Sequence, residues 1–135
     1  MACEFKMLHR VEFADTDMAG IIHFSSYFRY MEVTEHAFIR SLGFSVDMMK
    51  QLNVGWPRVH VDCDFKAPLR FEDEVEVHLR VREKKEKAIA YEFVFRKDGT
   101  EVARGSMTTV CVTRDASGKM KAVAIPEAVA RKIEA

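Results

Sequence analysis

The feature that most constrains this chain is a segment at residues 25–42 whose apolar residues cover most of the circumference of a helix. At about 100° per residue, Arg29, Glu32, His36 and Arg40 fall in one narrow polar stripe, and the rest of the circumference is mostly apolar. A helix that lies on a flat sheet buries one face only. This helix needs cover on nearly every side, so we predict that the rest of the chain wraps around it.

The remaining sequence can supply that cover as strands. Residues 4–13 alternate imperfectly between polar and apolar, and runs typical of strands follow at residues 58–69, 73–85, 88–99 and 100–114. Short turns at Lys97-Asp98-Gly99 and Ala116-Ser117-Gly118-Lys119 favour a meander of antiparallel strands. Short helices are predicted at residues 45–53, with Ser45 as N-cap, and from Pro126 onward.

Together these elements predict an α+β fold, in which a curved antiparallel sheet of about five strands wraps one long central helix. We expect residues 1–135 to form a single domain, since the chain has the usual length of one. The edges of such a sheet stay open, and pairing of two sheets across a dimer is the expected way to cover them.

Composition narrows the class of partner. The 21 Lys and Arg residues balance 21 Asp and Glu residues, so no long-range field favours nucleic acid or a membrane surface, and any anionic ligand must be held locally. The N-terminus lacks an apolar signal core and no stretch is long enough to span a membrane, so we expect a cytoplasmic protein. Cys3, Cys63 and Cys111 lie far apart without paired spacing and are expected to be ordinary thiols.

The segment VEFADTDMAGIIHFSSYFRYME carries the most chemical information, because a strand brings two acids to a turn directly before the apolar helix. Unpaired N–H groups at a helix start, and the positive end of its dipole, can receive an oxyanion. Asp17 could therefore attack a carbonyl or direct a water, while the N–H of Phe24 or its neighbours stabilises the developing charge. The alternative is that Asp17 is only a turn residue or helix cap, and Asp15 is expected to orient the loop.

Two stretches, DTDMAGIIHFSSYFRYME and WPRVHVDCDFKAPLRFEDEVEV, resemble the hotdog-fold acyl-CoA thioesterases of the 4-hydroxybenzoyl-CoA thioesterase type. That group includes the bacterial short-chain acyl-CoA thioesterases linked to the Tol-Pal system. The resemblance covers nearly the whole chain. Its most specific part is Asp-x-x-Gly followed by aliphatic and aromatic residues, matched here by Asp17, Gly20, Ile21, Ile22, Phe24 and Tyr27.

The resemblance implies that Asp17 is the catalytic carboxylate and that the N–H of Phe24 polarises the thioester carbonyl. It implies no metal and no bound cofactor, because CoA enters as part of an acyl-CoA or aryl-CoA substrate. It also implies a homodimer, or a homotetramer, with the acyl pocket at the dimer interface and the CoA nucleotide near basic residues. The expected substrate-binding residues are His23, Phe24, Tyr27, Arg58, Lys84, Lys85 and Lys87.

Several residues keep two interpretations at this point. Family members often carry two aromatic residues at the positions of His23 and Phe24, or a His at the second of them. Here the His comes one position earlier, which leaves the catalytic role of His23 open. Glu35 falls in the apolar arc of the helix and needs a partner or an open pocket, which the cleft of a neighbouring subunit could supply. Alternating His60, Asp62 and Asp64 fit an exposed strand face better than a metal site.

The sequence thus predicts a thioesterase that hydrolyses an acyl-CoA to a carboxylic acid and CoA. Two alternatives remain open. One is an acyl-CoA hydratase on the same fold, although His23 follows Asp17 closely for the Asp and His pair of such sites. The other is a non-catalytic module that binds acyl-CoA or acyl-carrier protein.

Overall fold

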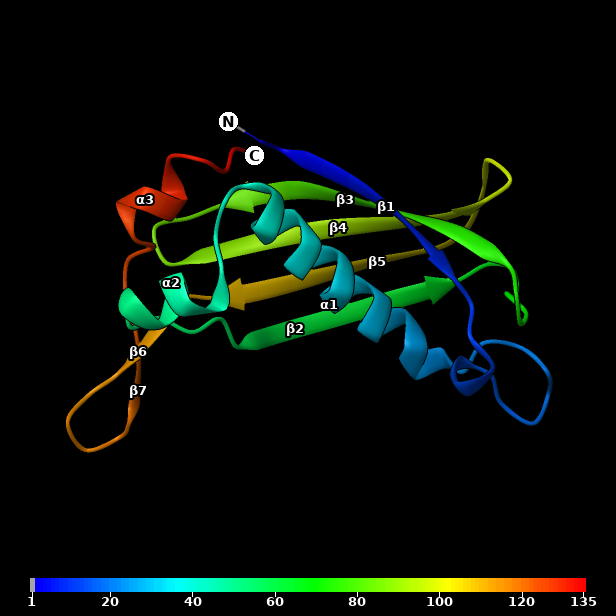
Figure 1. Cartoon of the computed structure of the whole chain (residues 1–135), viewed down its shortest axis with the longest axis horizontal. Coiled ribbons are helices and arrows are strands. Elements are labelled where there is room, and N and C mark those ends of the chain that lie inside the picture. The colour runs from blue at the N-terminus through cyan, green and yellow to red at the C-terminus, as the bar shows by residue number, and fades with distance from the viewer. Residues whose placement is uncertain (1) are drawn as a thin grey trace.

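The long apolar helix lies diagonally across one face of a curved antiparallel sheet, as Figure 1 shows for the computed structural model, which describes residues 2–135. The helical elements are η1 (a 3-10 turn, Phe13–Asp15), α1 (Phe24–Ser41), α2 (Val46–Gln51) and α3 (Glu127–Ala130). The strands are β1 (Glu4–Arg10), β2 (Arg58–Phe65), β3 (Glu74–Lys84), β4 (Ala88–Lys97), β5 (Thr100–Val110), β6 (Val112–Arg114) and β7 (Met120–Ala122). The predicted fold class is confirmed.

Helix α1 begins and ends within one residue of the predicted bounds. The residue before it, His23, is the N-cap, and its side chain accepts a hydrogen bond from the N–H of Ser25. Tyr30, Met31 and Phe38 are buried against the sheet, while the predicted polar stripe is exposed. Among residues 2–135 no helix is both long enough and apolar enough to cross a membrane.

The strand order corrects the predicted simple meander. The five-stranded sheet runs β1-β3-β4-β5-β2, so tight turns join only β3, β4 and β5 in sequence. Strand β2 pairs with β5 and places Cys63 opposite Gly105, whereas β1 pairs with β3 and places Met7 opposite Val77. The long connection at residues 66–73 allows this crossing, because it carries the chain from the edge strand β2 to β3, next to the opposite edge strand β1.

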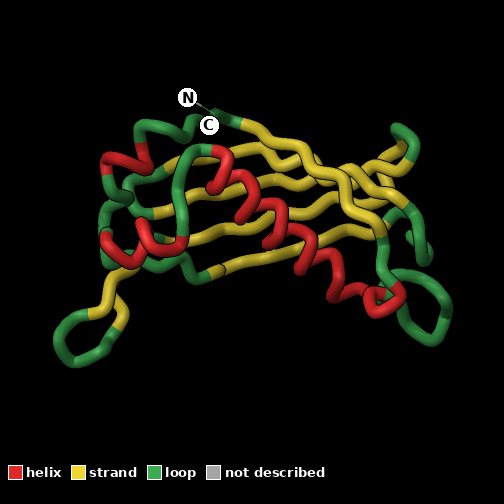
Figure 2. The backbone as a smooth tube through the Cα atoms, viewed as in Figure 1, coloured by secondary structure: helices red, strands yellow, loops and turns green. Residues whose placement is uncertain are grey.

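Two predicted strand boundaries were wrong. The run at residues 100–114 is divided at Cys111 into β5 and β6, although the Cys111 N–H still donates to the Lys87 carbonyl at 2.7 Å, one step beyond the last β4–β5 pair. Its end, β6, pairs with β7 in a separate hairpin that extends away from the main sheet (Figure 2). At the other end of the chain, Phe13 lies in η1 rather than in β1, because β1 already ends at Arg10.

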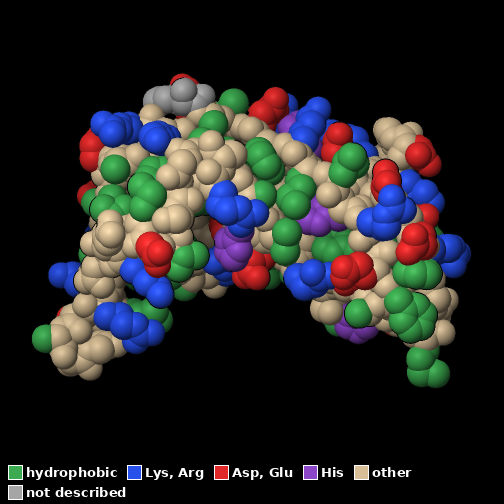
Figure 3. All heavy atoms as spheres, in the orientation of Figure 1, with side chains coloured by type: hydrophobic (Ala, Val, Ile, Leu, Met, Phe, Trp, Pro, Cys, Tyr) green, Lys and Arg blue, Asp and Glu red, His purple; other side chains and the backbone are tan. Residues whose placement is uncertain are grey.

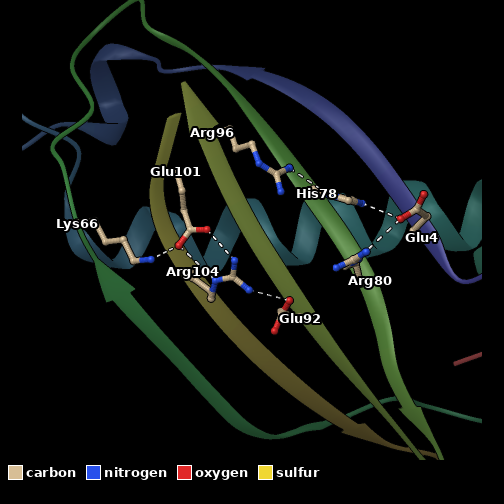
Figure 4. A network of polar contacts seen from close by, with 8 residues as sticks. All are labelled: Glu4, Lys66, His78, Arg80, Glu92, Arg96, Glu101 and Arg104. Carbon is tan, nitrogen blue, oxygen red and sulfur yellow. Dashed lines mark hydrogen bonds and ion pairs between the residues drawn. The ribbon is translucent and has the colours of Figure 1, made fainter. Parts of the chain in front are cut away.

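The two faces of the sheet differ sharply. On β4, Tyr91, Phe93 and Phe95 are buried on the side of α1, while Glu92 and Arg96 alternate with them on the outer face. Figure 4 shows the network of ion pairs and hydrogen bonds on that outer face, made by Glu4, Lys66, His78, Arg80, Glu92, Arg96, Glu101 and Arg104. Ion pairs at exposed or half-buried positions contribute little each, and this face also buries Val94 and His78, which are 2% and 7% exposed.

Strands β1 and β2 leave both edges of the sheet unpaired, as predicted. On β2, Val59, Val61 and Phe65 expose 61%, 42% and 50% of their surface although they lie on the strand face that α1 covers elsewhere. A long edge strand with exposed apolar side chains is a template for pairing with another strand. This edge extends from Phe65, which contacts Tyr27 near the start of α1, to Arg58, which pairs with Glu35 in the second half of the helix.

Candidate functional site

Asp17 lies in a closed loop just ahead of α1. The loop is held by hydrogen bonds from the Asp17 N–H to the Ile21 carbonyl (2.9 Å) and from the Gly20 N–H to the Asp17 carbonyl (3.0 Å). Gly20 adopts φ of 77°, which a residue without Cβ accepts readily. The carboxylate is exposed, and one of its oxygens accepts the N–H of Ala19 at 2.8 Å. The other oxygen forms no hydrogen bond within residues 2–135.

Asp15 ties this loop to the helix. Its carboxylate is buried and accepts hydrogen bonds from the hydroxyl of Tyr30 (2.6 Å), the N–H of Glu12 (2.9 Å) and the guanidinium of Arg29. Burial alone would raise the pKa of Asp15, but these three donors outweigh it and hold the pKa below its ordinary value. The two acids therefore differ in environment, with Asp15 anchored inside and Asp17 presented to solvent, in keeping with the orienting role predicted for Asp15.

The start of α1 provides a free amide next to this loop. Phe24 is the first helical residue, and in the described part of the chain its N–H has no acceptor. The N–H of His23 donates to the Asp15 carbonyl at 2.7 Å, so Asp15 also fixes the helix start. The imidazole of His23 contacts the hydroxyl of Ser25 at 2.8 Å and stacks on Phe24, which occupies it in capping. Along the chain, only the rest of the closed loop and the His23 cap lie between Asp17 and the Phe24 amide.

Tyr27, predicted to contact substrate, lies in the core near the start of α1. Only 3% of its surface is exposed, and its ring packs against Phe65 at 4.9 Å and Phe95 at 5.3 Å between centroids. Burial raises the pKa of its hydroxyl to about 12. Through Phe65 it connects the start of α1 to the end of the β2 edge.

A cavity of about 400 Å³ lies at the opposite end of α1, between the second half of that helix, α2 and the sheet. Its apolar wall is formed mainly by Ile39, Phe44, Met49, Trp56, Ile89 and Tyr91. A cavity of this size, largely apolar with a few polar groups, is typical of a site for a small organic group.

The polar part of the cavity wall includes a buried ion pair, of which the sequence indicated only one member. Glu35 is 5% exposed and bonds through its carboxylate to the guanidinium of Arg58. That guanidinium also donates to the carbonyl of Trp56 at 2.8 Å. The Nε of Arg58 and the indole Nε1 of Trp56 are buried and have no partner within residues 2–135. The position of Glu35 in the apolar arc of the helix correctly predicted that its carboxylate needs a partner. Which residue is that partner, Arg58, became visible only in the fold.

Glu35 should make stability depend on pH. Burial raises its pKa to about 7, and the neighbouring Arg58 offsets this only in part. Because the folded pKa lies above the unfolded one, the folded state binds more protons between these values, and stability falls as pH rises through that range. We expect Glu35→Gln, which stays neutral, to gain about 2 kcal/mol of unfolding free energy relative to wild type between pH 5 and pH 8.

Denaturant unfolding of both proteins at several pH values measures this difference. Glu86→Gln, an exposed carboxylate in the turn between β3 and β4, is the control and should show no such divergence from wild type. Parallel curves for wild type and Glu35→Gln would contradict the expectation.

The other predicted basic residues lie near the turn between β3 and β4. Lys84 donates through its ammonium to the carbonyls of Ala130 (2.9 Å) and Ile133 (2.8 Å), and so fastens the C-terminal segment. Lys85 and Lys87 are exposed. Figure 1 shows this turn beside α3, at the end of the molecule opposite the Asp17 loop. In one chain, the carboxylate and the basic residues therefore lie far apart.

The outer face of β2 does not gather metal ligands. His60 contacts Asp62 at 2.8 Å, and Asp62 also accepts the hydroxyl of Ser106. Within residues 2–135, no group of three or more His, Cys, Asp or Glu side chains is arranged to hold a metal ion. The polar alternation of β2 instead forms the exposed strand face that the sequence favoured.

A curved antiparallel sheet packs around α1, and a loop with an exposed carboxylate, Asp17, precedes that helix. This arrangement is that of a hotdog-fold protein of the thioesterase type. The chain belongs to the thioesterase-like superfamily, which matches residues 11–133. The family predicted from the sequence motifs is therefore confirmed.

Individual relatives agree with this assignment. A protein of Aquifex aeolicus is 33% identical over 120 residues, which cover 89% of this chain and 90% of the relative. A gentisyl-coenzyme A thioesterase of known structure is 34% identical with a TM-score of 0.84, over 93% of this chain and 99% of the other. The 4-hydroxybenzoyl-CoA thioesterase of Pseudomonas sp. strain CBS-3 shares the fold, with a TM-score of 0.88 at 19% identity over 97% of this chain and 99% of that one.

Proposed function

We propose that this protein hydrolyses an acyl-CoA or aryl-CoA thioester to the free carboxylic acid and CoA. The observation that carries the proposal is the position of Asp17, exposed in a closed loop directly before a helix whose first amide, on Phe24, is unpartnered. Membership of the thioesterase-like superfamily supports the reaction type, and the gentisyl-coenzyme A thioesterase supports CoA as the carrier.

The proposed chemistry needs one carboxylate and one oxyanion receptor. Asp17 either attacks the thioester carbonyl carbon itself or takes a proton from a water that attacks it. The carbonyl oxygen gains negative charge, which the Phe24 N–H and the positive end of α1 stabilise. The attack forms a new C–O bond, to water or to Asp17, and the C–S bond then breaks, so that the thiolate of CoA leaves and is protonated. When water attacks, this gives the acid directly. On the nucleophilic route, water finally hydrolyses the mixed anhydride on Asp17.

The proposed working unit is a homodimer, or a homotetramer built from it. The unpaired edge of β2 and its exposed apolar side chains support pairing of two copies. The acyl group is proposed to lie at their interface, near His23, Phe24 and Tyr27, with the CoA phosphates near basic residues. Lys85 and Lys87 are exposed and suited to phosphate contact, whereas Lys84 and Arg58 already have acceptors within the chain.

The test is thiol release from a panel of short-chain, long-chain and aryl CoA thioesters, followed with a thiol-reactive dye. We expect at least one substrate to reach a kcat/KM of about 10⁴ M⁻¹ s⁻¹ or more, the lower end of the range for enzymes. An enoyl-CoA substrate, followed by loss of its conjugated absorbance, tests for hydratase activity in the same preparation. Saturable CoA-ester binding without turnover of any substrate would instead identify a binding module and overturn the proposal.

A further inference from the structure

The start of α1 is held by a ring of hydrogen bonds around one backbone carbonyl. The carbonyl oxygen of Asp15 accepts the His23 N–H at 2.7 Å and the Ser26 hydroxyl at 3.1 Å. The Ser26 N–H in turn donates to the His23 carbonyl at 2.9 Å. That carbonyl and the Phe24 N–H belong to one planar peptide group. The direction in which the Phe24 N–H points is therefore set by where Asp15 lies.

The position of Asp15 depends in turn on the donors to its buried carboxylate. One oxygen accepts the Tyr30 hydroxyl at 2.6 Å and the Glu12 N–H at 2.9 Å, and the other accepts the Arg29 guanidinium. A carboxylate taken out of water needs such partners, and the folded state loses free energy for each one removed. The two side-chain donors differ in burial, because Tyr30 is only 2% exposed whereas the side chain of Arg29 is 51% exposed.

Arg29 holds Asp15 less firmly than its charge suggests. It belongs to the polar stripe of α1, and Figure 3 shows charged side chains of both signs on this solvent-facing side of the molecule. Water and neighbouring charges weaken an exposed ion pair, and a long side chain in solvent exchanges between rotamers. The Tyr30 hydroxyl is thus the side-chain donor that holds Asp15 from inside the core.

Tyr30 itself has a fixed orientation. His9 of β1 stacks on its ring, with centroids 4.8 Å apart and planes 10° apart. The Thr34 hydroxyl donates its proton to the Tyr30 carbonyl at 2.7 Å, so it accepts a hydrogen bond from the Nε2–H of His9 at 3.0 Å. Burial lowers the pKa of His9, which keeps this ring uncharged at neutral pH. The Tyr30 hydroxyl is therefore a fixed point from which the acid, the ring of hydrogen bonds and the helix start are placed.

We propose that Tyr30 is a positioning residue for the proposed hydrolysis. Its hydroxyl acts through Asp15 to aim the Phe24 N–H at the carbonyl oxygen that gains negative charge. The inference rests on the proposed function and deepens it, because Tyr30 lies in the core and serves the site without touching the substrate. An oxyanion receptor works only if it is in place before the charge develops, and a misplacement of about 1 Å costs on the order of 100-fold in rate.

Tyr30→Phe removes the hydroxyl and keeps a ring against His9. We expect kcat on the best thioester substrate to fall by at least about tenfold, with KM changed by less than about threefold, because the Phe24 N–H is needed most when the oxyanion forms. Steady-state kinetics at a temperature where every variant is folded measure both constants. A wild-type kcat in Tyr30→Phe would overturn the proposal.

Val129→Ala is the control for lost stability. Val129 is fully buried in α3, and Figure 1 shows α3 at the end of the molecule opposite the Asp17 loop. Its truncation should lower Tm without reaching the helix start. We expect Val129→Ala to keep the wild-type kcat, so that an equal fall of kcat in both variants would assign the loss in Tyr30→Phe to stability alone and remove the positioning role.

A double-mutant cycle tests whether Tyr30 acts through Asp15. Asp15→Asn should lower kcat at least as much as Tyr30→Phe, and the double variant should lie within about twofold of Asp15→Asn alone. Two losses that multiply in the double variant would show that the hydroxyl acts by another route, contrary to the proposal. If Asp15→Asn gives no cooperative thermal transition, Ser26→Ala replaces it, because it opens the same ring of hydrogen bonds by removing one hydroxyl.

Amide hydrogen exchange measures the positioning without any substrate. The His23 N–H is bonded to the Asp15 carbonyl, so its exchange rate reports whether the ring of hydrogen bonds stays closed. We expect Tyr30→Phe to speed this exchange by at least about tenfold and Val129→Ala to leave it within about twofold of wild type. An unchanged rate in Tyr30→Phe would rule out the positioning role, whereas thiol release by the wild-type protein, and with it the proposed function, would stand.

Discussion

Asp17→Asn is expected to lower kcat for thioester hydrolysis by at least about 10³-fold, because the amide can neither attack a carbonyl nor take a proton from water. Asparagine has the same shape and can still accept the Ala19 N–H that Asp17 now holds at 2.8 Å. The loop and its contacts to Asp15 should therefore persist. We expect KM to change by less than about threefold, since the groups proposed to bind the substrate remain in place.

Steady-state kinetics on the best substrate of the panel, with a thermal melt of each protein, separate a chemical from a structural effect. Asp98→Asn serves as the control: Asp98 is an exposed carboxylate in the β4–β5 turn, at a φ of 50° that Asn adopts readily. It should retain wild-type kcat. Activity of Asp17→Asn within threefold of wild type would assign the reaction to another group and remove the basis of the proposed function.

The sequence was sufficient for the helix and for the composition of the sheet. The narrow stripe of Arg29, Glu32, His36 and Arg40 required that α1 be enclosed, and only a curved sheet can enclose it. It was not sufficient for strand order. Alternation along a strand says which face is buried, but not which neighbour it pairs with, so β2 could not be assigned to the edge beside β5.

The same distinction holds for the site. The turn-helix junction at Asp17 and Phe24 is local in sequence, and local chemistry predicted a closed loop before a free helix amide. The cavity is not local, because α1, α2 and two strands contribute to its wall. Helical periodicity showed that Glu35 needs a partner, but its partner Arg58 lies 23 residues away and was first assigned to phosphate binding. Residue spacing along the sequence cannot predict contacts between side chains that only the tertiary fold brings together.

The pairing of β2 with the rest of the sheet depends on Gly105 of β5, which lies opposite Cys63 of β2. A Cβ at Gly105 would stand 2.5 Å from the carbonyl oxygen of Asp62 and would overlap the terminal methyl of Met31. A side-chain tip can move aside, but a backbone carbonyl moves only with its strand.

Gly105→Ala is therefore expected to push β2 away from β5 and to destabilise the fold by about 3 kcal/mol, near the upper end for overpacking. For a chain of this length, that corresponds to a fall of roughly 10 °C in Tm. Gly55→Ala is the control, because its added Cβ would meet only Val112, at an ordinary 3.7 Å. It should change Tm by less than about 3 °C.

Pairing Gly105→Ala with Met31→Ala separates the two clashes. Truncating Met31 frees space for the new methyl group but leaves the Asp62 carbonyl where it is, so the double variant should recover none of the lost stability. Recovery to the level of Met31→Ala alone would show that the side chain, not the strand, sets the limit. Because β2 also carries Arg58, its displacement should weaken the pair with Glu35.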